Sequence, residues 1–158
     1  MNTDPAGARS ILVTGAGRGL GRAIALHLAA PGAQLFLHHN ASEAGAQEVL
    51  REAAAKGARA VSLAADLADA AARDRMMAEV AQRTGALHVL VNGAGIYAER
   101  DLLETSAAEW QRVFDVTCGA VFHLTQLALP LLRPEALSRR CRRRAVTASR
   151  QPTGTQRR

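Results

Sequence analysis

The stretch that decides the fold is Ser10-Ile-Leu-Val-Thr-Gly-Ala-Gly-Arg-Gly-Leu-Gly21. Its first five residues, up to Thr14, form a short apolar run that is typical of a buried parallel strand. The glycines that follow allow a sharp turn and a close approach to a phosphate group, and a helix beginning at Gly19 would add N–H donors and a positive dipole. The stretch therefore predicts a dinucleotide-binding turn. No Gly-Lys-Ser/Thr follows the loop, which excludes a P-loop nucleoside triphosphatase.

The rest of the chain alternates between short apolar runs and amphipathic segments. Further strands are expected at 34–38, 58–63 and 87–92. Helices are expected at 19–30, at 43–56 with Ser42 as its cap, at 69–85, and at 106–129 with the capping box Ser106-Ala-Ala-Glu109. This alternation predicts an α/β fold of the Rossmann type: a doubly wound parallel sheet, incomplete, with about four strands in the order 3-2-1-4 and flanking helices.

The net charge of +6 is distributed unevenly over the 158 residues. Residues 133–158 contain nine arginines and one acid, Glu135, a net of +8, which leaves −2 for residues 1–132. All the aromatic residues also precede residue 133. We therefore expect the N-terminal part of a dinucleotide-binding Rossmann domain at 1–132. We expect a basic, disordered tail at 133–158, because its composition cannot build a core.

This basic tail has two possible origins. The body is rich in Ala, Gly and Arg, which suggests a GC-rich gene, and such genes often give Arg-rich text when read out of frame. The leading expectation is therefore a C-terminal truncation or frameshift. The alternative is an Arg-rich arm that binds RNA or another polyanion through its phosphates. No aromatic residues interleave with the arginines, so sequence-specific recognition of nucleic acid is not expected.

Several other classes of protein find no support in the sequence. Residues 1–9 contain no apolar run of signal-peptide length, and the apolar run at 127–132 is too short to span a bilayer. The two cysteines and five histidines lack metal-ligand spacing, so we expect no metal site and expect the histidines at the surface or half-buried. The low cysteine content fits a reducing compartment, and a cytoplasmic protein is expected.

Four motifs, in their order along the chain, resemble those of the short-chain dehydrogenase/reductase family. The glycine loop fits the pattern TGxxxGxG through Thr14, Gly15, Gly19 and Gly21. The other three motifs are Ala65-Asp66-Leu67 after the third strand, Leu90-Val-Asn-Gly-Ala-Gly95 after the fourth, and Trp110-Gln-Arg-Val-Phe-Asp-Val-Thr117 on the last helix. The resemblance covers about Ser10 to Leu132 and is nearest to the branch of the beta-ketoacyl carrier-protein reductases.

This resemblance implies an NAD(P)-dependent oxidoreductase that transfers hydride between a nicotinamide cofactor and a carbonyl or alcohol. In the family an Asp at the position of Asp66 hydrogen-bonds the adenine. The expected cofactor-binding residues are Thr14, Gly15, Arg18, Gly19, Leu20, Gly21, Ser42, Asp66, Leu67, Asn92, Ala94 and Gly95.

We expect NADP rather than NAD as the cofactor. The second strand ends in His38-His39-Asn40-Ala41-Ser42, without the acid that favours NAD. Arg18 stands where NADP-using relatives often carry a basic residue, and Ser42 can donate a further hydrogen bond to the ribose phosphate. The missing acid also argues against a methyltransferase, which usually carries one after this strand.

The residues that perform hydride chemistry in the family are not found. The family uses a Tyr with a Lys four residues later, a Ser roughly thirteen residues before the Tyr, and an Asn on the preceding helix. The single Tyr is Tyr97, followed four residues later by Asp101, and the single Lys is Lys56. Thr117 occupies the position of the Asn. No catalytic residue is therefore assigned, and the chain as written is expected to be inactive.

Two alternatives to an oxidoreductase stay open, a noncatalytic nucleotide-binding module and polyanion binding through the tail. A small carbonyl substrate is expected only in a full-length relative. In intact relatives the helix that contains Trp110 commonly forms part of a dimer interface, which implies an oligomer through this helix. Without a further strand, residues 87–92 would form an unpaired apolar edge, so we expect marginal stability and poor solubility.

Overall fold

The computed structural model describes residues 9–97, 101 and 103–132. Its strands and helices are β1 Ser10–Val13, α1 Gly19–Leu28, β2 Gln34–His39, α2 Glu43–Ala55, β3 Arg59–Ala64, α3 Ala70–Arg83, β4 Val89–Val91, α4 Ala107–Phe114 and α5 Ala120–Ala128. The strands pair in parallel in the order β3-β2-β1-β4, so the predicted α/β class and strand order are confirmed. The basic segment 133–158 lies outside the described residues, and its disorder stays a prediction.

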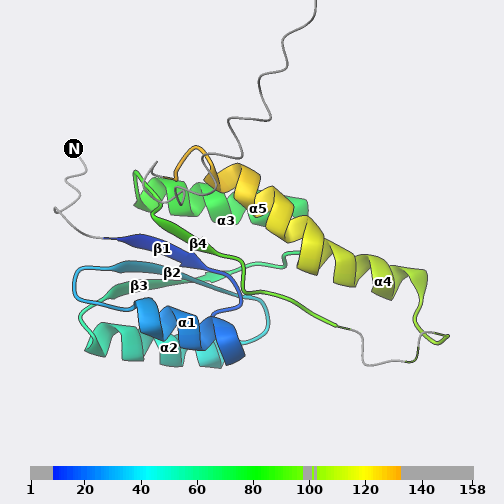
Figure 1. Ribbon diagram of the computed structural model, residues 1–158, viewed down its shortest axis with the longest axis horizontal. Coiled ribbons are helices and arrows are strands. Elements are labelled where there is room, and N and C mark those ends of the chain that lie inside the picture. The colour runs from blue at the N-terminus through cyan, green and yellow to red at the C-terminus, as the bar shows by residue number, and fades with distance from the viewer. Residues whose placement is uncertain (1–8, 98–100, 102, 133–158) are drawn as a thin grey trace, which may run out of the picture.

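Helices cover both faces of this sheet. Figure 1 shows α1 and α2 together on one face and α3 and α5 on the other, with α4 extending beyond the sheet. The register aligns Leu12 of β1 with Phe36 of β2 and with Leu90 of β4. Burial on both faces explains why the central strands contain continuous apolar runs, Ile11–Val13 in β1 and Leu35–Leu37 in β2, rather than alternating ones.

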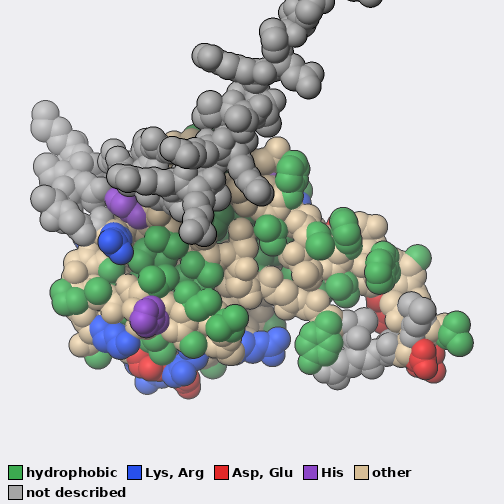
Figure 2. Space-filling view, viewed as in Figure 1, with side chains coloured by type: hydrophobic (Ala, Val, Ile, Leu, Met, Phe, Trp, Pro, Cys, Tyr) green, Lys and Arg blue, Asp and Glu red, His purple; other side chains and the backbone are tan. Residues whose placement is uncertain are grey.

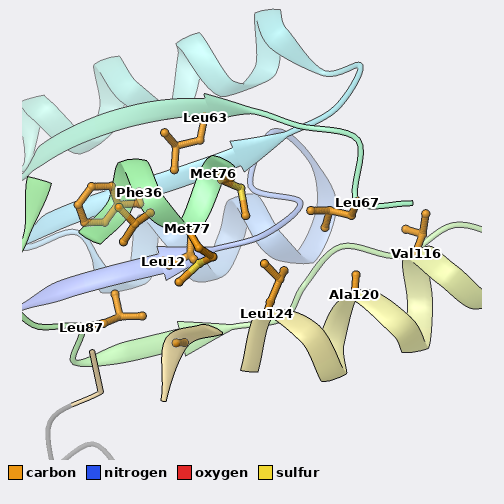
Figure 3. Close-up of a cluster of buried hydrophobic side chains, with 12 residues drawn as sticks. Leu12, Phe36, Leu63, Leu67, Met76, Met77, Leu87, Val116, Ala120 and Leu124 are labelled. Atoms are coloured by element: carbon orange, nitrogen blue, oxygen red, sulfur yellow. The ribbon is translucent and has the colours of Figure 1, made fainter. Parts of the chain in front are cut away.

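Each face of the sheet has its own hydrophobic core, because successive side chains along a strand point to opposite faces. Leu12 and Phe36 pack with Met76 and Met77 of α3 and with Leu124 of α5, as Figure 3 shows. The core beneath α1 and α2 contains the residues that alternate with these along the strands, together with helix residues: Ile11, Val13, Leu35, Leu37, Ala25, Val49 and Ala53.

The helix predicted at 106–129 is not uniform. Its start is confirmed, since Ser106 Oγ accepts the Glu109 N–H (3.2 Å) and a Glu109 carboxylate oxygen accepts the Ser106 N–H (3.0 Å). A π-helical turn at Asp115–Gly119 separates α4 from α5, a local widening that the sequence pattern did not reveal. Such turns are rare within helices and occur frequently at functional sites.

The fourth strand is shorter than predicted, and its edge is not wholly unpaired. Regular pairing with β1 is confined to Val89–Val91. Leu87 instead forms an isolated parallel bridge with Leu132, its N–H donating to the Leu131 carbonyl (2.8 Å), and its side chain is fully buried. The expectation of an open edge along the whole of 87–92 is therefore wrong at Leu87, because the chain after α5 returns to cover it.

Candidate functional site

The candidate site lies at the carboxyl ends of the strands, between the segments that follow β1 and β4. These two strands are neighbours although their connecting helices lie on opposite faces, and ligands of open parallel sheets bind at such a point. A cleft of about 350 Å³ opens there. Its lining includes ten of the twelve predicted cofactor-binding residues: Gly15, Arg18, Gly19, Leu20, Gly21, Ser42, Asp66, Leu67, Ala94 and Gly95.

The glycine loop forms the floor of this cleft. Gly15 and Gly19 have φ of +68° and +55°, the left-handed region in which a Cβ is strained. A Cβ on Gly21 would lie 2.2 Å from the Gly15 carbonyl oxygen, so α1 can begin this close to the turn only with glycine there. The exposed Arg18 precedes α1 in an extended conformation. The first N–H groups of α1 lack partners within the helix, and they suit an anion.

Helix α2 presses its first turn against the same loop. A Cβ on Gly45 would lie 2.1 Å from the Gly17 carbonyl oxygen, and a Cβ on Gly17 would lie 2.7 Å from the Ser42 carbonyl oxygen. Ser42 precedes α2 as predicted, but its side chain makes no capping hydrogen bond. Its half-buried hydroxyl lines the cleft instead. The glycine pair Gly17 and Gly45 thus sets how near the second helix comes to the phosphate turn.

Thr14 and Asn92 are the two predicted residues that do not line the cleft. Thr14 is buried beneath it, where its hydroxyl accepts the N–H groups of Gly93 (3.0 Å) and Ala94 (3.1 Å) and donates to the Val91 carbonyl (3.3 Å). Thr14 therefore joins the end of β1 to the segment after β4. The Asn92 amide instead donates to the Thr125 hydroxyl on α5 at 3.5 Å.

The histidines at the end of β2 correct the expectation that all five lie at the surface or half-buried. His38 is 2% exposed and His39 is 6% exposed. The His38 ring bonds to the backbones of Gly15 (3.2 Å) and Ala65 (3.1 Å), and His39 Nδ1 lies 3.2 Å from the Asn40 carbonyl oxygen. Burial lowers the pKa of His38, the hydrogen bond with Ala65 opposes this, and the nearby His39 lowers it further.

Asp66 is the one acid among the described residues that line the cleft, and both of its carboxylate oxygens have partners. Oδ1 accepts the Ala68 N–H at 2.9 Å, and Oδ2 accepts from the Arg112 guanidinium at 3.0 Å. The Ala68 hydrogen bond, followed by the contact with Arg112, holds the pKa of Asp66 below its ordinary value. Sequence reasoning missed Arg112, because 46 residues separate it from Asp66 and no spacing relates the two.

Thr117, at the position of the family's Asn, lies in the π-helical turn near the same end of the sheet. Its hydroxyl donates to the carbonyl of Ile96, which lines the cleft (3.3 Å). Tyr97 is exposed in the segment after β4. Lys56 closes α2 at the opposite end from Ser42, where its Nζ donates to the Leu26 carbonyl at 2.6 Å. Tyr97 and Lys56 therefore do not form a Tyr–Lys pair.

Among residues 9–97, 101 and 103–132, no three His, Cys, Asp or Glu side chains lie together as metal ligands. Within those residues no helix is both long and apolar enough to cross a bilayer.

The sequence is similar to that of characterised reductases. The model of the short chain dehydrogenase family matches residues 9–140. The chain is 40% identical over 122 residues to the 3-oxoacyl-acyl-carrier-protein reductase FabG of Staphylococcus aureus. The aligned region covers 77% of this chain and 50% of that protein. It is 39% identical over 122 residues to a hydroxynaphthalene reductase-like protein of Metarhizium anisopliae, and this alignment covers 77% of this chain and 46% of that protein. The chain thus spans about half the length of the curated relatives it matches.

Solved structures agree with this similarity. A short-chain dehydrogenase from Burkholderia cenocepacia in complex with NADP has a TM-score of 0.74 and 37% identity, over 79% of this chain and 51% of that one. The angucycline C-6 ketoreductase LanV with bound NADP has a TM-score of 0.71 and 33% identity, over 78% of this chain and 51% of that chain. With its glycine loop, strand order and cleft, the chain belongs to the short-chain dehydrogenase family.

Proposed function

We propose that residues 9–132 form the dinucleotide-binding part of an NAD(P)-dependent oxidoreductase for carbonyls or alcohols, with the cofactor bound in the cleft described above. The observation that carries this proposal is the gathering of ten predicted cofactor-binding residues around one cleft at the carboxyl edge of the sheet. The glycine turn and the N-terminus of α1 would hold the pyrophosphate, and the segment at Asp66 and Leu67 would hold the adenine.

The side chains around the adenosine end favour NADP over NAD. Arg18 and Ser42 line the cleft and offer a cation and a hydroxyl to a ribose phosphate. His39 and Asn40 follow one another at the end of β2, where an NAD-binding site would have an acid to hold the ribose hydroxyl. The carboxylate of Asp66 is already paired with Arg112, which reduces its repulsion of a phosphate. NADP is also bound in both of the solved structures described above.

We propose that this chain by itself binds the cofactor without transferring hydride. Thr117 can donate one hydrogen bond but does not supply the amide of an Asn, and the 158 residues contain no Tyr-x-x-x-Lys sequence. A carbonyl substrate would then be reduced only by a relative that has these groups.

Calorimetric titration with NADP⁺ and NAD⁺ tests the binding proposal. We expect NADP⁺ to bind about tenfold more tightly, the magnitude of one charge-assisted hydrogen bond. Equal or tighter binding of NAD⁺ would contradict the cofactor preference. Turnover of NADPH with a panel of small ketones would contradict the absence of catalysis. RNA binding that weakens steeply with salt, without NADP⁺ binding, would favour the polyanion alternative.

The exposed face of α4 and α5 is proposed as a contact with a second subunit. Figure 2 shows hydrophobic side chains at the surface of the part of the molecule that α4 and α5 form. Trp110, Phe114 and Phe122 are 63%, 52% and 66% exposed, although side chains of this kind are usually buried. Analytical ultracentrifugation should detect a dimer or larger species that Phe122→Glu disrupts and that Gln47→Glu, at an exposed position of α2 on the other face of the sheet, preserves. A wild-type chain that stays monomeric at high concentration would contradict the proposal.

A further inference from the structure

His38 lies where three segments of the candidate site meet. It belongs to β2, and its buried ring bonds to the glycine turn after β1 on one side and to the segment after β3 on the other. Gly15 donates its N–H to Nδ1 at 3.2 Å, and Nε2 lies 3.1 Å from the Ala65 carbonyl oxygen. Gly15 opens the phosphate turn and Ala65 immediately precedes Asp66, so one ring spans the pyrophosphate and adenine ends of the cleft.

The two partners determine the protonation state of this ring. A backbone N–H only donates and a carbonyl oxygen only accepts, so Nδ1 must be unprotonated and Nε2 must carry the hydrogen. Protonation would direct an Nδ1–H toward the Gly15 N–H, and this hydrogen bond would be lost. Burial lowers the pKa of His38 and thereby favours the neutral ring near pH 7. Among the residues that the structure describes, the other titratable side chains lining the cleft are Arg18, His39, Asp66 and Arg112.

Of these neighbours, Asp66 acts to raise the pKa of His38 and His39 acts to lower it. The Asp66 carboxylate is engaged by Ala68 and Arg112 rather than by the His38 ring. Since the ring's own partners are both backbone groups, its protonation state is coupled directly to the position of the Gly15 turn.

We propose that His38 is a positioning residue for dinucleotide binding: its neutral imidazole holds Gly15 and Ala65 at the separation the dinucleotide needs, and protonation of the ring weakens binding. This inference rests on the proposed function, since it concerns the same cleft. It adds a pH dependence to binding, carried by a group that need not touch the ligand.

Substitution of His38 tests each bond separately. His38→Asn keeps an acceptor near the Nδ1 position, and His38→Gln keeps a donor near the Nε2 position, but neither side chain titrates. The matched control is His88→Asn, because His88 Nδ1 also accepts a backbone N–H, that of Ser10 (3.0 Å), just before β4 and therefore at the opposite end of the sheet. Loss of one hydrogen bond from His38 should raise the Kd for NADP⁺ about fivefold at pH 8.

The decisive readout is the ratio of the variant Kd to the wild-type Kd for NADP⁺, measured by calorimetry as the pH is lowered from 8 through the titration of the wild-type His38 ring. A phosphate monoester titrates near pH 6, and the ratio removes this contribution of the ligand itself. We expect the ratio for both His38 variants to fall toward one in acid. There protonation removes the bond between the wild-type ring and Gly15, so the wild type, like each variant, keeps only one of the two bonds. The ratio for His88→Asn should not change with pH. A ratio for the His38 variants that stays constant through the titration of the wild-type ring would overturn the inference.

A measurement on the wild-type chain covers the case in which the His38 variants fail to fold. Nitrogen chemical shifts of the ring should show an unprotonated Nδ1 and a protonated Nε2 at pH 7. Saturating NADP⁺ should move the His38 titration to lower pH, because coupling between proton and ligand binding is reciprocal. The opposite tautomer, or a titration that NADP⁺ leaves unchanged, would refute the role of His38. Absence of NADP⁺ binding at pH 8 would instead refute the proposed function.

Discussion

Gly45 lies in the first turn of α2, where its α-carbon faces the glycine loop. An Ala Cβ at this position would lie 2.1 Å from the Gly17 carbonyl oxygen and 3.1 Å from the Gly17 carbonyl carbon. Both atoms belong to the backbone, so no side-chain rotation can relieve the contact. Helix and loop must separate by about 1 Å, and such overpacking costs on the order of 1–3 kcal/mol. Ala is favoured over Gly in helices by about 1 kcal/mol, which offsets only part of this cost.

We therefore expect Gly45→Ala to lower the free energy of unfolding by up to about 2 kcal/mol. The same displacement should raise the Kd for NADP⁺ by about tenfold, because it moves Gly17 and Ser42 at the cleft by a distance that breaks a hydrogen bond. Urea denaturation followed by circular dichroism measures the first effect, and calorimetry measures the second.

Gly119 provides the matched control, since it also lies within a helical segment, between α4 and α5. A Cβ there would meet no atom closer than 3.8 Å. Gly119→Ala should therefore stabilise the chain by about 0.5–1 kcal/mol through helix propensity alone. A Gly45→Ala variant that is as stable as Gly119→Ala and binds NADP⁺ like the wild type would refute the proposed role of the contact between Gly45 and Gly17.

Three further outcomes are expected. Thr14→Val should destabilise the fold by about 2 kcal/mol in urea denaturation, because two partly buried N–H groups lose their acceptor, whereas Thr14→Ser should cost about 1 kcal/mol. Arg18→Glu should raise the calorimetric Kd for NADP⁺ about tenfold while the Kd for NAD⁺ stays within about twofold, and equal changes for both would exclude Arg18 as the phosphate ligand. The pKa of Asp66 is lowered in the fold, so its contribution to stability is present above the ordinary value of 3.8 and is lost as the pH falls through the folded-state pKa. The loss of stability on acidification, measured by acid unfolding curves, should be smaller for Arg112→Ala than for the wild type. It should be unchanged for Arg83→Ala, which removes only a surface pair with Glu79.

The elements of the fold could be predicted because their signals are local. The run from Ser10 to Thr14 and the glycines after it specify a strand, a turn and a helix within twelve residues. The capping box at Ser106 was predicted for the same reason. The π-helical turn at Asp115–Gly119 was not predicted, because it occurs within an uninterrupted apolar pattern and without a proline.

The candidate site was predictable only in part. The glycine turn and the segments around Asp66 and Ala94 follow from motifs at the carboxyl ends of strands, which a parallel sheet brings to one edge. The partners of the side chains there were not predictable. Arg112 reaches Asp66 across 46 residues, and His38 joins backbone groups 23 residues before it and 27 after it.

The sequence by itself determined the α/β class, the strand order, the glycine turn and the family resemblance, because short-range propensities and motif spacing are written in neighbouring residues. Only the tertiary structure decided that Thr14 joins two strands, that Asn92 faces α5 rather than the cleft, and that Leu87 is covered by the chain after α5. It also decided that His38 is buried with a fixed tautomer. The physical reason is that hydrogen bonds and burial depend on which strands pair and in what register, and these contacts join residues that the sequence keeps far apart.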